Sequence, residues 1–288
     1  MPDGEPGEAY ELGRTCALAA ECRRDLRRCA QMYGALFPPA AFDAELYTSL
    51  TLGTAFSAPW AGADRLKVVN RAALWVLAVD RLVNHTATTR EQVNRLTREC
   101  VSVADGAVPR SAVTRFLADL RDELATVKDF DGLRWLWRDQ LARMLAGMAR
   151  AWVWRDTRAT PTLARYLDNA DSHGSCFVDL SHWIYTADEW ARAHLADVRA
   201  VSRQVQRYLH LLGDVASYRK DMSWGDLNIL GLGVSRAEVT EAMERLAREA
   251  ARRIEPVGEH SPRTAAYLRR QIGFKAGFNG ISDSGRPA

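Results

Sequence analysis

The chain has 288 residues, of which 47% are hydrophobic and 26% are charged, as in an ordinary globular protein. This length fits one large domain or two small ones. The formal net charge of only +3 at pH 7 does not point to nucleic-acid binding. Charged residues interrupt every apolar run before about 18 residues, so no membrane-spanning segment is expected.

The N-terminal segment has no basic stretch followed by an apolar core, so no secretory signal is predicted. Five cysteines, an odd number without a CxxC pair, indicate reduced thiols in a cytoplasmic protein. Their spacings do not favour a zinc site. Nine tryptophans suggest an aromatic-lined interior, although simple core packing would also explain them.

Apolar residues recur with a period of 3.6 along nearly the whole chain, and no segment alternates with the period of two that marks strands. The breaks are short, and none resembles a linker between domains. The pattern predicts one all-α domain over 1–288, with flexible tails at about 1–7 and 279–288. Asp64 is a candidate N-cap for the third helix. The predicted helices are 8–34, 41–57, 64–84, 88–104, 110–127, 130–155, 160–170, 174–188, 190–220, 235–253 and 261–275.

The helix 64–84 carries a carboxylate on its apolar face. Leu66, Val69, Ala73, Val76, Asp80 and Asn84 share this face. A carboxylate at the end of an apolar stripe needs a partner or a metal, because its burial alone would be costly. Pairing of Asp80 with Arg81 or Arg71 is the alternative explanation.

The segment GDVASYRKD, residues 213–221, is the second chemical cluster. Gly213, Ser217 and Asp221 lie at i, i+4 and i+8 and therefore share one helix face. Arg219 and Lys220 stand directly before Asp221. A hydroxyl, a carboxylate and two cations at one helix end suit a metal held against a phosphorylated ligand.

These two segments resemble the metal motifs of class I terpene synthases. GDVASYRKD resembles Asn-Asp-x-x-Ser-x-x-Lys-Glu, with Gly213 in place of Asn and Asp221 in place of Glu. Asp80 takes the first position of Asp-Asp-x-x-Asp, where Arg81 and Asn84 replace the second and last aspartates. The separation of about 133 residues between Asp80 and Gly213 is typical of the family.

The segment RYLDNADSHGSCF resembles a third family motif, Tyr-Leu-x-x-Arg-x-x-Thr-x-Gly. Tyr166 and Leu167 match it, Ala170 stands at the diphosphate-sensing arginine and His173 at the threonine. The resemblance implies that the Gly174 carbonyl, at a helix break, faces the substrate. A kink or close helix packing would also explain this glycine.

Three further segments extend the resemblance over about residues 40–287. IGFKAGFNGISDSGRP resembles the family's C-terminal helix, with Arg286 in the place of a diphosphate-binding arginine and Pro287 in that of tyrosine. SWGDLNIL resembles Gly-Asp-x-x-Asn-Leu, although a capped turn is the favoured interpretation of Asp226 and Asn228. AFSAPW leans toward bacterial diterpene synthases of the ent-kaurene synthase type.

The resemblance implies an all-α, single-domain helical bundle around a central cavity. It also implies a terpene cyclase, a carbon–oxygen lyase that ionises a copalyl-type or geranylgeranyl diphosphate with up to three Mg²⁺ and releases pyrophosphate. No nucleic acid partner is implied, and a homodimer is compatible with the family. The expected metal ligands are Asp80, Asn84, Ser217 and Asp221; the diphosphate ligands are Arg219, Lys220 and Arg286; and the catalytic residues are Asp80, Arg81 and Gly174. The expected pocket residues, chosen by helix face, are Phe56, Trp75, Val79, Phe177, Trp183 and Tyr208.

Two other functions are compatible with the sequence. The loss of several motif positions favours a terpene synthase-like protein that no longer ionises its ligand and binds an isoprenoid or a protein partner. Prenyl transfer fits less well, because prenyltransferases usually keep two full aspartate-rich motifs. A further hypothesis is that the Arg81 guanidinium partly replaces one metal ion.

Overall fold

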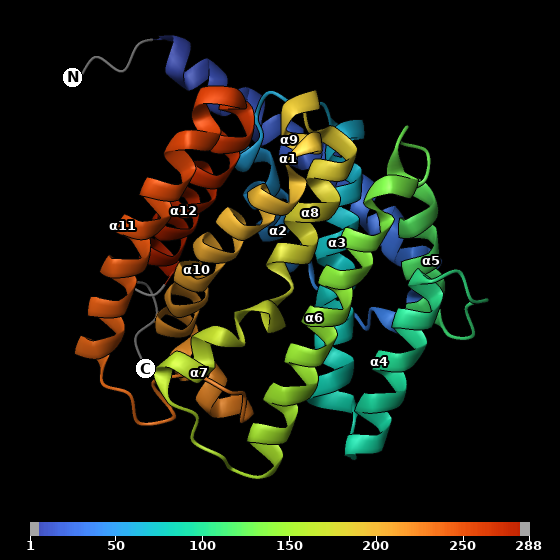
Figure 1. The fold of residues 1–288 in the computed structure, drawn as a ribbon, viewed down its shortest axis with the longest axis vertical. Helices are drawn as coiled ribbons and strands as arrows, with labels where there is room; N and C mark the ends of the chain where they lie inside the picture. The colour runs from blue at the N-terminus through green and yellow to red at the C-terminus, as the bar shows by residue number, and fades with distance from the viewer. Residues whose placement is uncertain (1–5, 283–288) are drawn as a thin grey trace.

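The computed structural model describes residues 6–282 of the chain, and the side chains of residues 7–278. Every regular element in this part of the chain is a helix, which confirms the all-α prediction (Figure 1). The α-helices are α1 (Pro6–Met32), α2 (Ala44–Ser57), α3 (Ala63–Arg81), α4 (Arg90–Ala104), α5 (Ala112–Leu124), α6 (Phe130–Asp156), α7 (Leu163–Asp168), α8 (Ser175–Thr186), α9 (Glu189–Ala193), α10 (Leu195–Trp224), α11 (Arg236–His260) and α12 (Pro262–Ser282).

Short elements with other hydrogen-bond spacing mark three places in the chain. The 3₁₀ turn η1 (Gly34–Leu36) follows α1, and the π-helical turn η2 (Leu82–Thr86) continues α3. The 3₁₀ turn η3 (Ala170–His173) separates α7 from α8. Turns of the π type often occur at functional sites, and η2 carries Asn84.

Most predicted helix boundaries lie within a few residues of the observed ones, with four differences. The helix α11 continues to His260, beyond the predicted end at residue 253, with Pro256 inside it. The N-cap of α3 is Gly62 and not Asp64, which lies in the first turn. The predicted helix 190–220 is divided at His194 into α9 and α10. The helix α12 continues to Ser282, so residues 279–282 are helical where a tail was predicted.

The helix α3 lies at the centre of the bundle and packs against α1, α2, α5 and α8. Its side chains Leu74, Trp75 and Val79 are fully buried. The indole N–H of Trp75 donates to the Val113 carbonyl at 2.9 Å, which satisfies the one polar atom of that ring. The Phe177 ring of α8 lies 5.6 Å from Trp75. This packing fixes the direction in which the Asp80 side of α3 faces.

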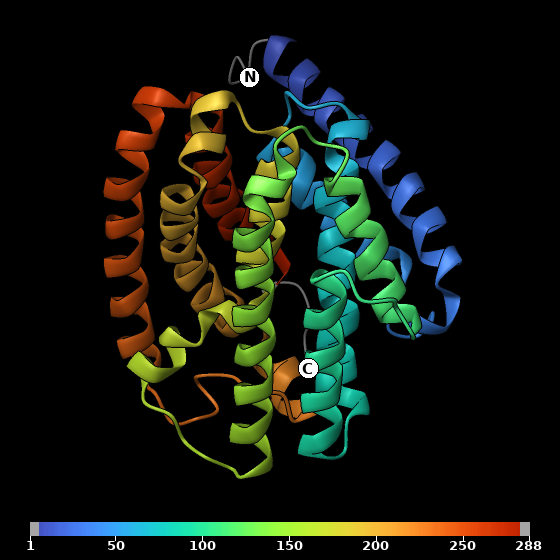
Figure 2. The same ribbon diagram turned by 45° about the vertical axis from the view of Figure 1, so that its right-hand side comes forward.

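Helices α10, α11 and α12 lie on one side of the bundle and α4, α5 and α6 on the other (Figures 1 and 2). A smaller apolar cluster joins α6, α7, α10, α11 and the loop that follows α10, and it includes Trp154, Tyr166 and Ile229. This cluster packs the C-terminal end of α6 against α10. No helix within residues 6–282 is both long and apolar enough to cross a membrane.

Candidate active site

A cavity of about 270 Å³ lies between α3, α6, η3 and α10. Four carboxylates line it: Asp80, Asp214, Asp221 and Asp226. Among the side chains of residues 7–278, Arg155 is the one arginine or lysine in its wall. The structure thus brings together both predicted motif segments, which are far apart in the sequence. It also adds three charged residues, Arg155, Asp214 and Asp226, that were not predicted to lie there.

The α3 side of the cavity is a short hydrogen-bonded chain of three residues. The Asn84 amide donates to Asp80 Oδ1 at 2.8 Å, and Arg155 Nη1 donates to Asn84 Oδ1 at 3.3 Å. Burial raises the pKa of Asp80 to about 6, and the neighbouring charge of Asp226 acts in the same direction. The predicted alternative, an ion pair of Asp80 with Arg81 or Arg71, does not occur among the described residues.

The α10 side of the cavity holds the predicted face of GDVASYRKD. The Ser217 hydroxyl lies 2.6 Å from Asp221 Oδ2 and 2.9 Å from the Gly213 carbonyl. The Asn228 amide donates to the same Asp221 oxygen at 2.9 Å and to the Asp214 carbonyl at 2.8 Å. The loop after α10 therefore folds back and holds the Asp221 carboxylate toward the cavity.

The capped-turn interpretation is right for Asn228 only in part and wrong for Asp226. Asn228 Oδ1 accepts the Leu230 N–H at 3.0 Å, as in a capped turn, but its amide also supports the site. Asp226 Oδ1 is buried without a hydrogen-bond partner among the described residues and lines the cavity. It lies 3.7 Å from His85 Nε2 and 3.8 Å from Arg155 Nη1. Burial raises the Asp226 pKa against the opposing effect of His85.

A third group of titratable side chains lies on the wall formed by η3 and α10. Burial raises the pKa of Asp214 to about 7, and Ile229 N–H donates to its Oδ2 at 3.2 Å. The rings of His173 and His210 lie 3.6 Å apart. Desolvation by the surrounding cavity wall lowers the His173 pKa to about 4, and burial lowers the His210 pKa well below its usual range. Both imidazoles are therefore uncharged near pH 7.

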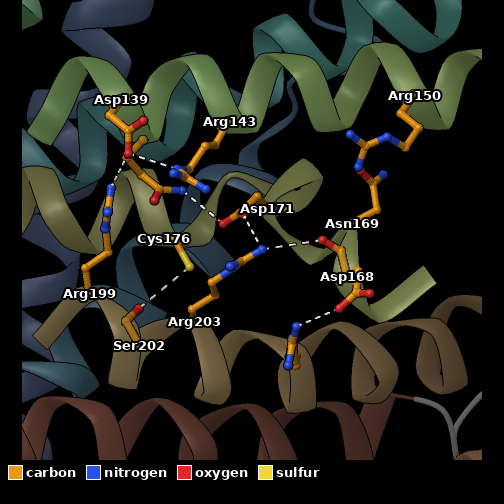
Figure 3. Close-up of polar contacts among 12 residues, drawn as sticks. Asp139, Arg143, Arg150, Asp168, Asn169, Asp171, Cys176, Arg199, Ser202 and Arg203 are labelled. Atoms are coloured by element: carbon orange, nitrogen blue, oxygen red, sulfur yellow. Dashed lines mark hydrogen bonds and ion pairs between the residues drawn. The ribbon is translucent and has the colours of Figure 1, made fainter. Parts of the chain in front are cut away.

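The break between α7 and α8 is anchored by polar contacts to α6 and α10 (Figure 3). Gln140 of α6 donates to Asp171 at 3.0 Å, and Arg203 of α10 lies 3.1 Å from the same carboxylate. Arg150 donates to Asn169 at 2.9 Å. This network lies where the family carries its sensing arginine. Ala170, at that position, is buried.

Gly174 ends this break in a left-handed conformation, with φ of +74°. A Cβ atom on it would lie 2.4 Å from Val76 Cγ1 and 2.9 Å from Met144 Sδ. Close packing, the alternative considered for this glycine, is therefore present. The Gly174 carbonyl accepts the Val178 N–H at 3.0 Å, the first hydrogen bond of α8. Its predicted role toward a substrate remains a prediction.

The other predicted charged residues lie outside this cavity or outside the described residues. Arg81 does not line the cavity. The guanidinium in the cavity wall belongs to Arg155 instead. Arg219 and Lys220 are exposed outside it, and the Lys220 ammonium lies 4.4 Å from the centre of the Trp224 ring. Arg286 lies outside the described residues.

The six predicted pocket residues do not line this cavity or the adjoining one of about 390 Å³. Trp75, Val79 and Phe177 point into the core, and Trp183 lines a separate hollow. Phe56 stacks on Phe274 at 5.4 Å, and Tyr208 packs in the smaller apolar cluster. Several residues that do line the cavities directly follow a predicted pocket residue in the sequence. Because one residue along a helix corresponds to about 100° of rotation, the prediction chose the wrong face. These neighbours are Val76, Val178 and Leu209.

The donor set fits a hard divalent cation. Four carboxylates converge on a cavity with one guanidinium, and the unpartnered Asp226 oxygen is already desolvated. Mg²⁺ prefers oxygen ligands and usually keeps several waters. Asp80, Asp221 and Asp226 are the residues that would hold such ions, with the Ser217 hydroxyl and the Asn84 carbonyl as neutral donors.

Comparison with known proteins agrees with this arrangement. Residues 72–255 match the family described as "Terpene synthase family 2, C-terminal metal binding". No curated protein sequence matches the chain. The fold is similar to that of 2-methylisoborneol synthase from Streptomyces coelicolor A3(2), solved with Mg²⁺ and geranyl-S-thiolodiphosphate. That match has 17% identity, covers 93% of this chain and 92% of that one, and has a TM-score of 0.70.

Two other solved structures show the same fold. Linalool/nerolidol synthase from Streptomyces clavuligerus, solved with 2-fluorogeranyl diphosphate, is 14% identical over 92% of this chain and 98% of that one, with a TM-score of 0.66. A single-residue variant of cucumene synthase is 19% identical over 93% and 96%, with a TM-score of 0.67. The fold and the site define a class I terpene synthase. The chain belongs to terpene synthase family 2, with a C-terminal metal-binding region.

Proposed function

We propose that the chain is an active, Mg²⁺-dependent terpene cyclase that ionises a prenyl diphosphate and releases pyrophosphate. The observation that carries this proposal is the convergence of Asp80, Asp221 and Asp226 on one cavity with Arg155. Such a site holds a polyanion only when divalent cations neutralise the carboxylates. When bound, Mg²⁺ supplies charge stabilisation for the departing diphosphate.

The chain's own residues divide the site into two ends. Arg155 is placed to donate to a diphosphate oxygen, and Asn84 orients it through the 3.3 Å hydrogen bond. The adjoining cavity of about 390 Å³ shares Val76, Leu77 and His173 with the first. Its wall is largely apolar, with Leu46, Leu50, Leu209 and Phe274 among its residues. This end would hold the hydrocarbon and exclude water from a carbocation.

We favour a C20 substrate, either copalyl-type or geranylgeranyl diphosphate, because of the sequence resemblance to bacterial diterpene synthases. The two solved synthases with analogues carry a geranyl-type ligand, so shorter diphosphates belong in the same test. Product identity depends on pocket contours of about one methyl group.

A ligand-binding protein without ionisation is the second candidate. Two observations favour it: Ala170 replaces the sensing arginine, and both ends of the Asn84 amide are occupied by Asp80 and Arg155. Such a protein would still bind a prenyl diphosphate, but it would release no pyrophosphate.

The deciding experiment incubates the purified chain with Mg²⁺ and C10, C15, C20 and copalyl diphosphates. Pyrophosphate release and extracted hydrocarbon are both measured. We expect turnover with at least one substrate, its loss on chelation, and its loss in Asp80→Asn. Asp105→Asn is the matched control, because Asp105 pairs with Arg138 on the exposed surface. Binding of a diphosphate without pyrophosphate release would favour the second candidate and overturn the first.

A further inference from the structure

Three side chains on one wall of the cavity present metal-binding atoms to a common point. They are His173 of η3 and, one turn apart on α10, His210 and Asp214. One ligand atom from each lies within 4.8 Å of the other two. His210 Nε2 and Asp214 Oδ1 are 3.9 Å apart, which is too long for a hydrogen bond. None of the three residues is among the metal ligands predicted for the helix 64–84 or for the segment GDVASYRKD.

The buried imidazole of His210 lacks one of the partners that buried polar groups usually have. His210 is 4% exposed, and its Nδ1 has no hydrogen-bond partner among the described residues. A buried donor or acceptor without a hydrogen-bond partner destabilises the fold. The buried carboxylate Asp179 of the adjoining cavity shows the contrast. It accepts hydrogen bonds from Ser202, Gln206, Tyr267 and Gln271.

The wall that carries His173 is held against α10 by two ion pairs. Of the preceding residues, Asp171 lies 3.1 Å from Arg203 (Figure 3), and Asp168 lies 2.9 Å from Arg207. Both arginines come from α10, the helix that also carries His210. The backbone positions of the two histidines are therefore fixed relative to one another, which is the preorganisation that a ligand set requires.

We propose that His173, His210 and Asp214 bind one divalent transition-metal ion, of the Zn²⁺ or Co²⁺ class. This ion is separate from the Mg²⁺ ions expected at Asp80, Asp221 and Asp226. Imidazole ligands favour such ions over Mg²⁺. Metal–ligand distances of about 2.0–2.2 Å place two ligand atoms at most about 4.4 Å apart. The His210–Asp214 pair already satisfies this limit. His173 is exposed to the cavity and needs only a small side-chain rotation.

Three protein ligands leave an open coordination position on the cavity side, as in catalytic rather than structural zinc sites. An ion there would face the space between the carboxylate end and the apolar end of the site. It could take a diphosphate oxygen or a water molecule as its fourth ligand. Binding of the ion itself requires no turnover and does not depend on the proposed cyclase activity.

The test uses the full chain after removal of bound metals by a chelator. Co²⁺ is added in a large excess of Mg²⁺, which occupies the oxygen sites, and visible absorption and calorimetry are recorded. We expect one Co²⁺ per chain with the intense absorption of four-coordinate Co²⁺ bound through nitrogen. His173→Ala and Asp214→Asn should each weaken Co²⁺ binding by at least about tenfold, the lower end of what loss of a supporting group costs.

His194→Ala is the matched control, since His194 is exposed and stacks on Trp190 outside both cavities. It should bind Co²⁺ like the unmodified chain. Two results would overturn the proposal. One is the absence of stoichiometric Co²⁺ binding in the presence of Mg²⁺. The other is binding of equal strength in the His173→Ala and His194→Ala variants, when both retain the native circular dichroism.

Discussion

Arg155 and Asn84 are joined across the cavity by a hydrogen bond, with 3.3 Å between Arg155 Nη1 and Asn84 Oδ1. Because the Asn84 amide nitrogen donates to Asp80 at 2.8 Å, the three side chains form one chain from α3 to α6. Asn84 therefore acts as a bridge between a carboxylate and a guanidinium.

This arrangement predicts different roles for the two arginines near Asp80. Arg155→Ala should lower kcat/KM for diphosphate ionisation by about 10²-fold, the usual cost of losing one donor to developing charge. Arg81→Ala should change it by only a few-fold, since Arg81 does not line the cavity. Pyrophosphate release measures both. A greater loss in Arg81→Ala would instead support the hypothesis that Arg81 partly replaces a metal ion.

Gly213 leaves an open position in the α10 face that carries Ser217 and Asp221. A Cβ atom on Gly213 would meet nothing within 4 Å. Gly213→Asn should therefore fit, add an amide oxygen to the cavity wall and tighten Mg²⁺ binding. Calorimetric titration with Mg²⁺ and a non-ionisable diphosphate analogue measures the change.

Gly213→Ala is the control for this variant. Alanine adds no ligand but removes the helix penalty of glycine, so it should stabilise the fold by about 1 kcal/mol without changing Mg²⁺ affinity. If Gly213→Ala tightened Mg²⁺ binding as much as Gly213→Asn, the effect would come from helix rigidity, and the ligand interpretation would fail.

The sequence predicted the elements well because helix periodicity and glycine or proline breaks are local signals. It also predicted that Asp80, Ser217 and Asp221 share one site, because the spacing of the two segments matched that of a known family. The prediction of the pocket residues was wrong for a geometric reason. Trp75 and Val79 were assigned to the cavity, but Val76 and Leu77 line it. Trp75 instead donates to Val113 of α5.

Arg155 and Asp226 could not be found from local patterns. Arg155 lies in the last turn of α6, where a basic residue is ordinary, and only the packing of α6 beside η2 brings it to Asn84. Asp226 looked like a turn residue, and only the return of the loop after α10 turns it into the cavity. In the sequence His173 is only a substitution in the third motif, whereas its approach to His210 depends on the break before Gly174.

Gly174 should not tolerate any side chain. Its φ of +74° is costly for other residues, and a Cβ atom would lie 2.4 Å from Val76 Cγ1. Gly174→Ala should therefore lower the free energy of unfolding by roughly 2–4 kcal/mol, from backbone strain and overpacking together. Urea denaturation measures this loss.

A second substitution separates the two contributions. Val76→Ala in the Gly174→Ala background should recover the part caused by the clash, and the backbone part should remain. If the double variant were no more stable than Gly174→Ala, the close contact with Val76 would not be the source of the loss.

His182 predicts a specific dependence of stability on pH. It is buried, stacks on Tyr267 at 4.6 Å, and its Nδ1 has no partner among the described residues. Burial lowers its pKa to about 3, and the nearby charge of Arg65 contributes. The unfolded chain has a histidine pKa of about 6.5. Its contribution to stability is therefore fully present above that pH and is lost as the pH falls toward 3.

His182→Phe keeps an aromatic ring against Tyr267 and removes the titration. Between pH 7.5 and 5.5, the unmodified chain should lose about 1 kcal/mol more of its free energy of unfolding than His182→Phe. Urea denaturation at several pH values gives both curves, and all other titrating groups are common to the two proteins. Parallel curves over this range would mean that His182 is protonated in the folded protein or titrates equally in both states, and burial would then not control its charge.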